Sequence, residues 1–335
     1  MKVAVVILNY NGEGHLRRFL PSVVENSCGV DVVVADNGST DGSLQLLSRE
    51  FDSVRIVELG KNYGFAEGYN RALAQLKEYD CYVLLNSDVK TPKGWLDPLV
   101  DRLKADNTIA AVGPKILSVE QPDKFEYAGA SGGFIDFLGY PFCRGRILST
   151  TEQDCGQYDD SREVFWVSGA AFCVRSEVYH ALGGLCGDFF AHMEEIDLCW
   201  RIQLAGWRVV VEPKSAVYHL GGGTLQTNSP RKIMLNHRNN LAMLYRCATP
   251  LQRAVVALVR PLLDMAAAAS YIAGGNFKGA RAVFEAWRDF ICWHKRLAAE
   301  RREIRKNVAK ESHNIYKGMI VFRYILGRRK FENLL

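Results

Sequence analysis

The strongest constraint on the fold of this 335-residue chain is the alternation of short apolar runs with helical segments in its first third. Each run is long enough for one buried strand, and between two runs Leu16, Leu20 and Val23 recur at helical spacing. Short connections between such segments predict βαβ units and a doubly wound, mostly parallel α/β sheet. The predicted strands are Val3–Leu8, Val30–Ala35, Val54–Leu59, Cys81–Leu85 and Ile109–Val112.

Three polar clusters follow predicted strands at the point where each strand ends. They are Asn9-Tyr10-Asn11-Gly12, Asp36-Asn37-Gly38-Ser39 and Asn86-Ser87-Asp88. Ligands of doubly wound sheets bind outside the carboxyl ends of the strands. We therefore expect the three clusters to line one cleft.

The clusters have a functional and an ordinary interpretation. Asp88 is suited to a Mg²⁺ or Mn²⁺ ion that bridges phosphate oxygens, and Asp36 is suited to a nucleoside donor group. The same residue types also form plain turns. The loop with Asn62 and Gly64 precedes a predicted helix at about Ala66–Lys77, whose first N–H groups suit a phosphate.

Two later residues are further candidates. His219 ends a strand-like run before three glycines, and imidazole is a good ligand for Mn²⁺-type ions, although a lone histidine is more often structural. Arg238 is suited to clamping a phosphate, with an exposed arginine at a helix start as the ordinary alternative.

The run Phe189–Trp207 predicts a helix with a carboxylate on its apolar face. Steps of three and four residues from Glu195 reach Leu198, Cys199 and Ile202, all apolar. A carboxylate among core residues is unfavourable unless it is paired or used in chemistry. Glu195 is therefore expected to be either paired or used in chemistry, and the helix alone does not indicate which.

Charge and cysteine content add two expectations. Residues 251–335 hold 17 Lys and Arg against 7 Asp and Glu, whereas the whole chain has a net charge of only +5, so the preceding body is acidic. We predict a first domain over residues 1–249 and a basic helical extension over 250–335 that meets something anionic. The nine scattered cysteines form no C-x-x-C pair, and the N-terminus lacks a signal-peptide pattern, so a cytoplasmic location is expected.

Seven motifs, in order, resemble the family 2 inverting glycosyltransferases, most closely their bacterial rhamnosyltransferase-like branch. They are VVILNYNG, VVVADNGSTDGS, KNYGFAEGYNRAL, VLLNSDV, WVSGAAFCVR, MEEIDLCWRIQLAGW and AVYHLGGGT. The resemblance covers about Lys2 to Asn240. It implies a GT-A fold, which is a Rossmann-like, mostly parallel sheet flanked by helices. It also implies a nucleotide-sugar donor and a divalent metal, Mg²⁺ or Mn²⁺.

The resemblance implies positions for the substrates and the metal. The nucleotide base and ribose would lie at Leu8, Tyr10 and Asp36. The sugars would be lined by Trp166, Ser168 and Gly169. The family's D-x-D metal motif falls on Asn86 and Asp88, and His219 stands where many members have a further ligand. Asn86 replaces the first acid, which leaves one carboxylate at the metal.

The catalytic base is implied by the same resemblance. Glu195 falls on the second acid of the family's E-D motif, with Glu194 and Asp197 beside it. Glu195 is one methylene longer than the usual Asp, so its helix is expected to sit slightly further back. It would take the proton of the acceptor hydroxyl during a single inverting displacement.

The resemblance therefore predicts a metal-dependent hexosyltransferase of cell-surface polysaccharide biosynthesis. The leading donor is dTDP-rhamnose, and the acceptor is a saccharide or a lipid-linked saccharide. One alternative is a sugar nucleotidyltransferase, but NYNG lacks the basic residues of its usual nucleotide loop. The other is a non-catalytic nucleotide-sugar or saccharide binder, which would explain the basic tail and not the carboxylate of Glu195.

The C-terminal extension predicts a helix that lies in an anionic membrane surface, on the cytoplasmic face of the inner membrane. Its apolar face is formed by Phe277, Ala280, Val283, Phe284, Trp287, Phe290, Ile291 and Leu297. The alternative is a helical hairpin that packs on the first domain. Upstream, Arg260, Pro261 and Asp264 interrupt an apolar stretch and argue against a membrane span. Nucleic acid is not expected as a partner, because no nucleic-acid-binding module accompanies the charge.

Overall fold

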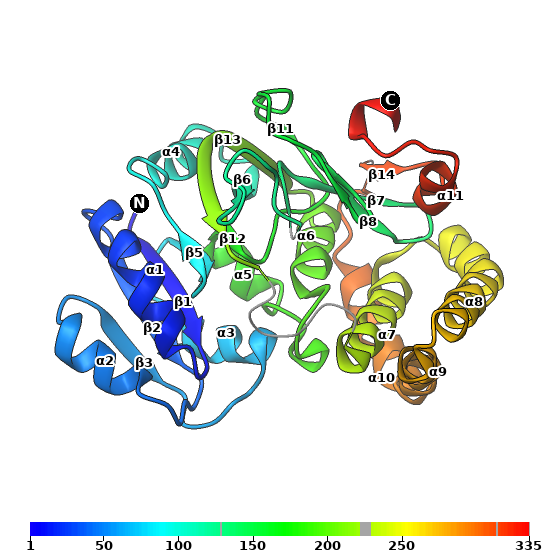
Figure 1. Ribbon diagram of the computed structural model, residues 1–335, viewed down its shortest axis with the longest axis horizontal. Coiled ribbons are helices and arrows are strands. Elements are labelled where there is room, and N and C mark those ends of the chain that lie inside the picture. Colours follow the sequence, from blue (N-terminus) through cyan, green and yellow to red (C-terminus); the bar gives the residue numbers. More distant parts are fainter. Residues whose placement is uncertain (128, 222–228, 313, 335) are drawn as a thin grey trace.

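The computed structural model describes residues 1–127, 129–221, 229–312 and 314–334 and is built around one large sheet (Figure 1). Gly222 and Gly223, which belong to one of the sequence motifs, lie outside the described residues. The strands of the large sheet are β1 (Val3–Asn9), β2 (Asp31–Asp36), β3 (Arg55–Glu58), β4 (Cys81–Asn86), β5 (Val89–Lys90), β6 (Ile109–Ser118), β11 (Arg162–Glu163), β12 (Ala171–Arg175) and β13 (Arg208–His219). Their order is β11-β13-β6-β12-β4-β1-β2-β3, and β5 pairs with β13.

The large sheet is mostly parallel, as predicted. β1 pairs in parallel with β2 and β4, β2 with β3, and β6 with β13. β12 runs antiparallel between β4 and β6. β6 continues to Ser118, past the predicted end at Val112, although Gly113 and Pro114 are poor strand residues. The ladder to β13 is irregular between Val211 and Ala216, so Pro114 sits at a bulge, where prolines are tolerated in sheets.

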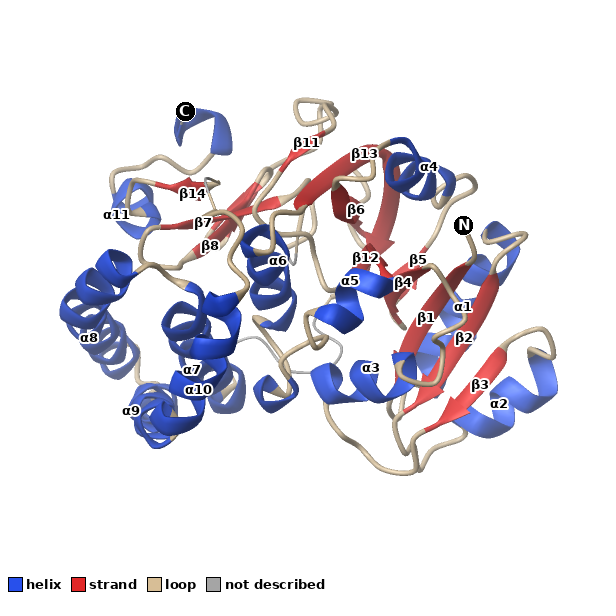
Figure 2. Cartoon of the chain, turned by 180° about the vertical axis from the view of Figure 1, so that it is seen from behind, coloured by secondary structure: helices blue, strands red, loops and turns tan. Residues whose placement is uncertain are grey.

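Helices cover both faces of the large sheet (Figure 2). Alternate residues of β1 enter different cores: Val5 and Ile7 pack with α1, α2 and α4, whereas Ala4 and Val6 pack with α3, α5 and α6. The bounds are α1 (Glu13–Asn26), α2 (Ser43–Glu50), α3 (Phe65–Leu73), α4 (Asp97–Ala105), α5 (Ser176–Ala181) and α6 (Glu194–Leu204). A short 3₁₀ turn, η1 (Gly187–Phe189), precedes α6.

The Gly- and aromatic-rich stretch after β6 forms a second sheet. Its strands are β10 (Thr150–Thr151), β9 (Arg146–Ile147), β8 (Pro141–Cys143), β7 (Gly133–Asp136) and β14 (Ile315–Tyr316), in that order. β14 belongs to the C-terminal extension and pairs in parallel with β7. The sequence did not indicate that the C-terminal extension supplies a strand of this sheet.

The C-terminal helices pack against one another and against the body of the protein. They are α7 (Pro230–Cys247), α8 (Pro250–Ala273), α9 (Phe277–Cys292), α10 (His294–Lys306) and α11 (Ile320–Ile325), followed by the 3₁₀ turn η2 (Phe331–Leu334). α9 and α10 pack on α7, and α8 packs on α9. In both ribbon views α8, α9 and α11 lie at the end of the molecule opposite β3 (Figures 1 and 2). The predicted division at residues 249 and 250 stays a prediction.

The expected apolar face of α9 is divided between two environments. Ala280 and Val283 are buried in a small core with Ile233 of α7 and Ala268 of α8. Phe277, Phe284 and Ile291 instead form an exposed stripe. α9 therefore packs on α7 and α8 through one apolar stripe and exposes a second, and its location in a membrane surface stays a prediction.

Candidate active site

The polar clusters that end β1, β2 and β4 meet at one edge of the large sheet. Leu8 pairs with Asn86 on one side and with Ala35 on the other, and Asn9 pairs with Asp36. The expectation that these clusters come together is met by the strand register.

The carboxylate of Asp36 shapes the turn at the end of β2. It is buried and accepts hydrogen bonds from the backbone N–H groups of Gly38 at 3.1 Å and Ser39 at 2.9 Å, and from the Asn9 amide at 3.2 Å. Gly38 has φ +78°, and a Cβ there would lie 2.4 Å from the backbone of Lys61. Asp36 therefore fixes the tight β2–α2 turn from within. By contrast, Tyr10 is 48% exposed beyond the end of β1 and presents its ring to solvent.

The loop with Asn62 and Gly64 contacts the segment before α6. Asn62 Oδ1 accepts the N–H of Gly64 at 2.8 Å. A Cβ on Gly64, which has φ +80°, would lie 2.4 Å from the ring of Phe190. The N–H groups of Phe65 and Ala66 donate to the Phe190 carbonyl at 2.7 and 3.2 Å. Two of the N–H groups expected to face a phosphate are thus bonded to the protein itself.

Four polar side chains, which we call the histidine cluster, gather where β4, β5 and β13 meet: Asn86, Asp88, Glu126 and His219. His219 pairs with Val89 across the β5–β13 ladder, which places it beside Asp88. Its Nε2 atom lies 3.1 Å from Asp88 Oδ1 and 3.4 Å from the Asn86 amide nitrogen. Its Nδ1 atom lies 3.2 Å from Glu126 Oε2.

The charges of the histidine cluster compensate one another. Burial lowers the pKa of His219, but contacts with Asp88 and Glu126 outweigh that effect and raise it to about 10. Burial likewise raises the pKa of Asp88, but the hydrogen bond and the charge of His219 outweigh it, and the net pKa is lowered. Asp88 is therefore ionised at neutral pH although it is buried.

A second group, which we call the glutamate cluster, consists of Glu194 and Glu195 at the start of α6, with Gly169 beside them. Each glutamate has a buried Oε2 atom with no hydrogen-bond partner among the described residues. Burial raises the pKa of Glu195 to about 7. Burial and the charge of Glu195 raise the pKa of Glu194 well above its usual range. A Cβ on Gly169 would lie 3.7 Å from the Glu195 side chain, so a small residue faces the carboxylate.

The backbone before the glutamate cluster is strained. Phe190, His192 and Met193 have φ of 65°, 71° and 72°, in the left-handed region that non-glycine residues avoid. Such residues cost roughly 1–3 kcal/mol each and persist only where the surroundings hold them. Met193 is the N-cap residue of α6, so the strained segment sets the direction in which Glu194 and Glu195 leave the backbone.

Two neighbouring residues of α7 hold the strained segment. The buried amide of Asn239 is directed at the carbonyls of Phe189, Ala191 and His192, at 3.0, 2.9 and 2.8 Å. Arg238 donates to the Phe189 carbonyl at 3.3 Å and to Asn239 Oδ1 at 3.0 Å. α7 thereby anchors the backbone that delivers the glutamates.

The two clusters are joined by residues 168–170. The N–H of Asn86 donates to the Ala170 carbonyl at 2.9 Å, while the preceding residue, Gly169, faces Glu195. One short segment therefore borders both clusters. The site thus combines a permanently charged cluster with a carboxylate that is able to exchange a proton near neutral pH.

Comparison with known proteins identifies the family. The chain matches the model of glycosyl transferase family 2 over residues 4–155. It is 33% identical over 233 residues to an N-acetylglucosaminyl-diphospho-decaprenol L-rhamnosyltransferase of Mycobacterium tuberculosis, and the alignment covers 64% of this chain and 75% of the relative. The chain belongs to glycosyltransferase family 2. Within the family it is rhamnosyltransferase-like.

Solved structures of glycosyltransferases show the same GT-A fold. GalNAc-T7 with UDP, GalNAc and Mn²⁺ superposes with a TM-score of 0.58 at 17% identity, covering 73% of this chain and 48% of that one. The mannosyltransferase PcManGT of Pyrobaculum calidifontis, in complex with GDP-Man and Mn²⁺, has a TM-score of 0.52 at 18% identity, covering 91% and 86%.

The structure gives Asp197 a different role from the one expected in this glycosyltransferase. Asp197 is fully buried, and its two oxygens accept from Arg201 at 2.8 Å and from Arg246 at 2.7 Å. Paired in this way, it joins α6 to α7. The expectation that Asp197 acts beside the catalytic base is not supported by this pairing, which gives Asp197 a structural role between the two helices.

Two expected ligand-binding residues also prove to be structural. Trp166 is 2% exposed, lies against Gly133 of the second sheet and donates to the Phe134 carbonyl at 3.0 Å, so it does not line a sugar site. Arg238 lies in the middle of α7, stacks 4.2 Å from the ring centroid of Trp293 and donates to backbone carbonyls. It is neither a phosphate clamp nor an exposed arginine at a helix start.

Asn239 and Glu126 also belong to the site, although the sequence motifs do not single them out. Asn239 belongs to the polar run His237 to Asn240, whose density of amides and charges inside a helix was an available signal. Glu126 lies in the stretch between β6 and β7, where no motif or periodicity set it apart. Its position behind His219 emerges only from the fold.

The histidine cluster fits a divalent metal that takes further ligands from its substrate. No group of three or more His, Cys, Asp or Glu side chains within the described residues is arranged to hold a metal ion alone. However, Asp88 and His219 direct an oxygen and a nitrogen at each other, and Mg²⁺ and Mn²⁺ sites commonly use one or two protein groups together with substrate phosphates. Glu126 behind His219 matches the carboxylate that usually orients a metal-binding histidine.

Proposed function

We propose that this enzyme transfers a sugar from a nucleotide-sugar donor to a lipid-linked saccharide, with inversion at the anomeric carbon. The observation that carries the proposal is the unpaired carboxylate of Glu195, which faces Gly169 at the border of the histidine cluster. Asp197, on the same helix, is fully paired by two arginines. Unlike Asp197, Glu195 and the adjacent Glu194 thus each have a buried oxygen without a partner among the described residues.

The reaction we propose is one displacement at the anomeric carbon. The acceptor hydroxyl oxygen attacks that carbon and loses its proton to Glu195, while the bond from the carbon to the nucleoside diphosphate breaks. A single attack from the face opposite the leaving group inverts the configuration. A base with a pKa near 7 is suited to this transfer at neutral pH, since it is partly ionised and still accepts a proton.

The histidine cluster is the proposed metal and diphosphate site. Asp88 and His219 would hold Mg²⁺ or Mn²⁺, which when bound offsets the negative charge that develops on the leaving diphosphate. Glu126 would orient His219 through Nδ1. Because bound metal displaces the imidazole proton, metal affinity is expected to fall as the pH is lowered.

The donor and acceptor are proposed from the similar rhamnosyltransferase of Mycobacterium tuberculosis. That protein is named for transfer of L-rhamnose to N-acetylglucosaminyl-diphospho-decaprenol. We propose the same classes here: a deoxyhexose donor, with dTDP-rhamnose as the leading candidate, and a polyprenyl-diphosphate-linked sugar in cell-surface polysaccharide biosynthesis. Leu8 and Tyr10 at the end of β1 are the proposed contacts of the nucleotide base.

A location on the cytoplasmic face of the membrane is part of the proposal. The exposed stripe Phe277, Phe284 and Ile291 of α9 alternates with the exposed cations Arg281 and Arg288. Apolar side chains flanked by arginines are typical of helices that lie in an anionic membrane surface. Binding to anionic vesicles that is reversed by salt, and lost without residues 251–335, is the expected result.

Transfer assays with purified full-length protein test the proposed function. dTDP-rhamnose and a panel of UDP-, GDP- and dTDP-sugars are incubated with N-acetylglucosaminyl-diphospho-polyprenol in detergent, with Mn²⁺ or with EDTA. We expect metal-dependent transfer and a product whose NMR coupling constants show inverted anomeric configuration. Retained configuration, or no transfer from any donor of the panel, contradicts the proposal.

A further inference from the structure

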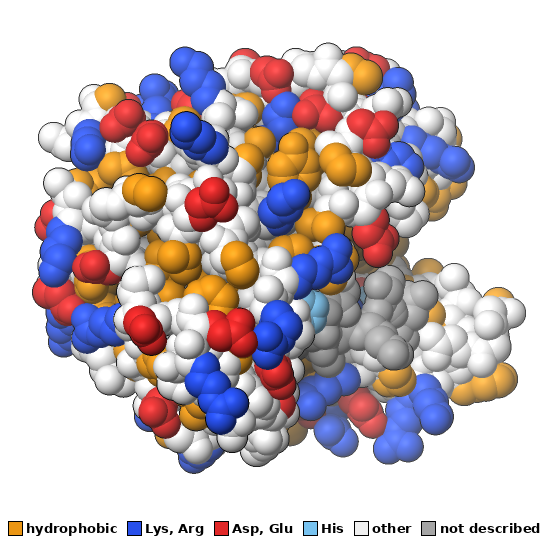
Figure 3. Space-filling model, turned by 60° about the vertical axis from the view of Figure 1, so that its left-hand side comes forward, with side chains coloured by type: hydrophobic (Ala, Val, Ile, Leu, Met, Phe, Trp, Pro, Cys, Tyr) orange, Lys and Arg blue, Asp and Glu red, His pale blue; other side chains and the backbone are white. Residues whose placement is uncertain are grey.

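α8 carries its polar residues on the inside and its apolar residues on the outside. Leu258 is 75% exposed and Leu262 is 72% exposed, whereas Arg260 and Asp264 are each 1% exposed. Every charged residue of α8 thus faces the protein or its edge, and the exposed positions are nearly all apolar. The face of the protein drawn in Figure 3 differs, since acidic and basic side chains are interspersed there with apolar ones.

This orientation of α8 is fixed by a buried polar network. Arg260 donates to the carbonyl of Leu138 at 3.0 Å and also bonds Asn240 and Asp264. Asp264 accepts from the Trp287 indole at 3.0 Å and lies 3.2 Å from His237. Rotating α8 to bury its leucines would leave these charged groups exposed or without hydrogen-bond partners. The free-energy cost of that change exceeds the cost of leaving apolar surface in water. Among the described helices, α8 is one that is long and apolar enough to cross a membrane, judged by length and composition alone.

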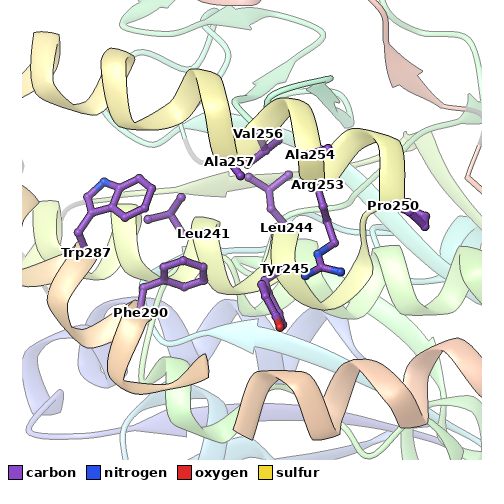
Figure 4. Close-up of a pocket in the computed structure, with 10 residues that line it drawn as sticks. All are labelled: Leu241, Leu244, Tyr245, Pro250, Arg253, Ala254, Val256, Ala257, Trp287 and Phe290. Carbon is purple, nitrogen blue, oxygen red and sulfur yellow. The ribbon is translucent and has the colours of Figure 1, made fainter. Parts of the chain in front are cut away.

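A cavity of about 470 Å³ lies between α7, α8 and α9 (Figure 4). This size is within the usual range for sites that bind small ligands. Trp287 and Phe290 of α9 and Tyr245 of α7 form an aromatic wall, with ring centroids 5.8 and 6.1 Å apart in edge-to-face pairs. Arg253, which stacks on Tyr245 at 4.2 Å, is the charged residue among those that line the cavity.

The cavity is continuous with the exposed face of α8. Ala254 and Ala257 line it and are also exposed on the outer side of the helix. Leu241, at the inner wall of the cavity, is adjacent in sequence to Asn240. The side-chain amide of Asn240 lies 3.9 Å from the sulfur of Met193 at the start of α6. The cavity therefore connects an apolar surface with the helix that anchors the catalytic segment.

We propose that this cavity binds the isoprenoid chain of the lipid-linked acceptor, an inference that rests on the proposed function. A long hydrocarbon chain matches the apolar and aromatic wall, and the open side along Ala254 and Ala257 lets the rest of the chain continue over α8. Arg253 provides a cation near the entrance for an acidic diphosphate group. The chain is thereby held beside α7, the helix whose Asn239 anchors the backbone before Glu195.

Photocrosslinking of the wild-type protein tests the occupant directly. The probe is an isoprenyl diphosphate of fifteen to twenty carbons, on the order of what a cavity of this class holds, that carries a benzophenone at the end of the chain. We expect adducts within residues 241–257 or 287–290, and competition by unlabelled isoprenyl diphosphate. Equal labelling by a benzophenone phosphatidylglycerol would mean that the cavity takes any lipid chain and would overturn the assignment. Adducts elsewhere, or protection of the cavity by a second copy of the protein, would also overturn it.

A cavity-filling substitution gives the kinetic test. Ala257→Trp places an indole in the opening, and Ala299→Trp makes the same change at an exposed position of α10, outside the cavity. Two acceptors are compared: N-acetylglucosaminyl diphosphate on a polyprenyl chain, and the same group on a butyl chain. Wild type should have at least about tenfold lower KM for the polyprenyl acceptor, in line with the burial of several methylene groups. Ala257→Trp should abolish this preference, whereas Ala299→Trp should retain it.

The outcomes separate this inference from the proposed function. Transfer to both acceptors with equal KM in the wild type, or a preference unchanged in Ala257→Trp, overturns the isoprenoid site and leaves the glycosyltransferase activity standing. No transfer to either acceptor contradicts the proposed function, while crosslinking of the wild type still reports whether an isoprenoid chain occupies the cavity.

Discussion

The histidine cluster and the glutamate cluster both contain buried carboxylates, but only the carboxylates of the histidine cluster have a partner of opposite charge. In the first, His219 lies between Asp88 and Glu126, so each charge has a partner and the pKa of Asp88 is lowered. In the second, Glu195 has a buried oxygen without a partner among the described residues, and burial raises its pKa to about 7. One cluster keeps a fixed charge, and the other holds a proton that exchanges near neutral pH.

The comparison shows that burial alone does not identify a catalytic carboxylate. Asp197 is more deeply buried than Glu195, yet two arginines satisfy it and it serves the packing of α6 on α7. What distinguishes Glu195 is the absence of a compensating cation, together with the strained backbone that places it there. Buried carboxylates with a neighbour of opposite charge are suited to binding, and those without one are suited to proton transfer.

Removing the fixed charge of Asp88 should have the largest effect on sugar transfer. Asp88→Ala takes away the carboxylate proposed for the metal and leaves His219 with Glu126, so we expect complete loss of transfer with the fold intact. Binding of the donor, measured by calorimetry with and without Mn²⁺, should become weaker and independent of metal. Asp101→Ala, on the exposed side of α4, is the matched control and should behave as wild type. Near-wild-type turnover of Asp88→Ala would show that the metal assignment is wrong.

Removing the exchangeable proton site should have the next largest effect. Glu195→Gln keeps the size of the side chain but cannot accept a proton, so kcat should fall by about a hundredfold or more. Affinity for the donor should change little, because the histidine cluster remains. Steady-state kinetics and donor titration give the two quantities.

Glu194→Gln is the control that decides between the two glutamates. It removes a carboxylate adjacent to Glu195 and should reduce kcat much less. A large loss from Glu194→Gln combined with a mild effect of Glu195→Gln would transfer the role of the base to Glu194.

The fold and the approximate position of the site could be predicted from the sequence. Apolar runs such as those of β1, β2 and β4 have the length and composition of buried strands, and parallel pairing brings their polar ends together. The helix that carries Glu195 was predicted correctly, but its spacing did not indicate that Glu194 and Asp197 are buried more deeply than Glu195. These features follow from local periodicity, which a single sequence contains.

The partners of the long side chains could not be predicted. Arg238 was expected to reach a phosphate and instead bonds backbone carbonyls before α6, and Trp166 was expected to contact a sugar and instead packs under the second sheet. Contacts of this kind join segments far apart in the chain, and the sequence offers no periodicity that reveals them. The same limit hid Glu126.

Loosening the strained segment before α6 should lower kcat less than the loss of the Glu195 carboxylate does. Asn239→Ala removes the amide directed at three carbonyls before α6, so Glu195 is expected to lose its orientation. A displacement of this size should lower kcat by about tenfold and leave the donor KM nearly unchanged. Amide hydrogen exchange in the segment 189–193 should become faster. Faster exchange with unchanged kcat would show that the strained segment does not contribute to catalysis.

The pH dependence of kcat/KM tests the central claim that Glu195, kept without a partner, is the proton acceptor. Because the base must be ionised and burial raises its pKa to about 7, activity should fall as the pH drops below 7 and level off above it. At saturating Mn²⁺, which removes the pH dependence of metal binding, the descending limb should follow about tenfold per pH unit, and the residual activity of Glu195→Gln should lack it. A profile of the wild type that is flat between about pH 5.5 and 8.5, or a limb that persists in Glu195→Gln, would contradict the account.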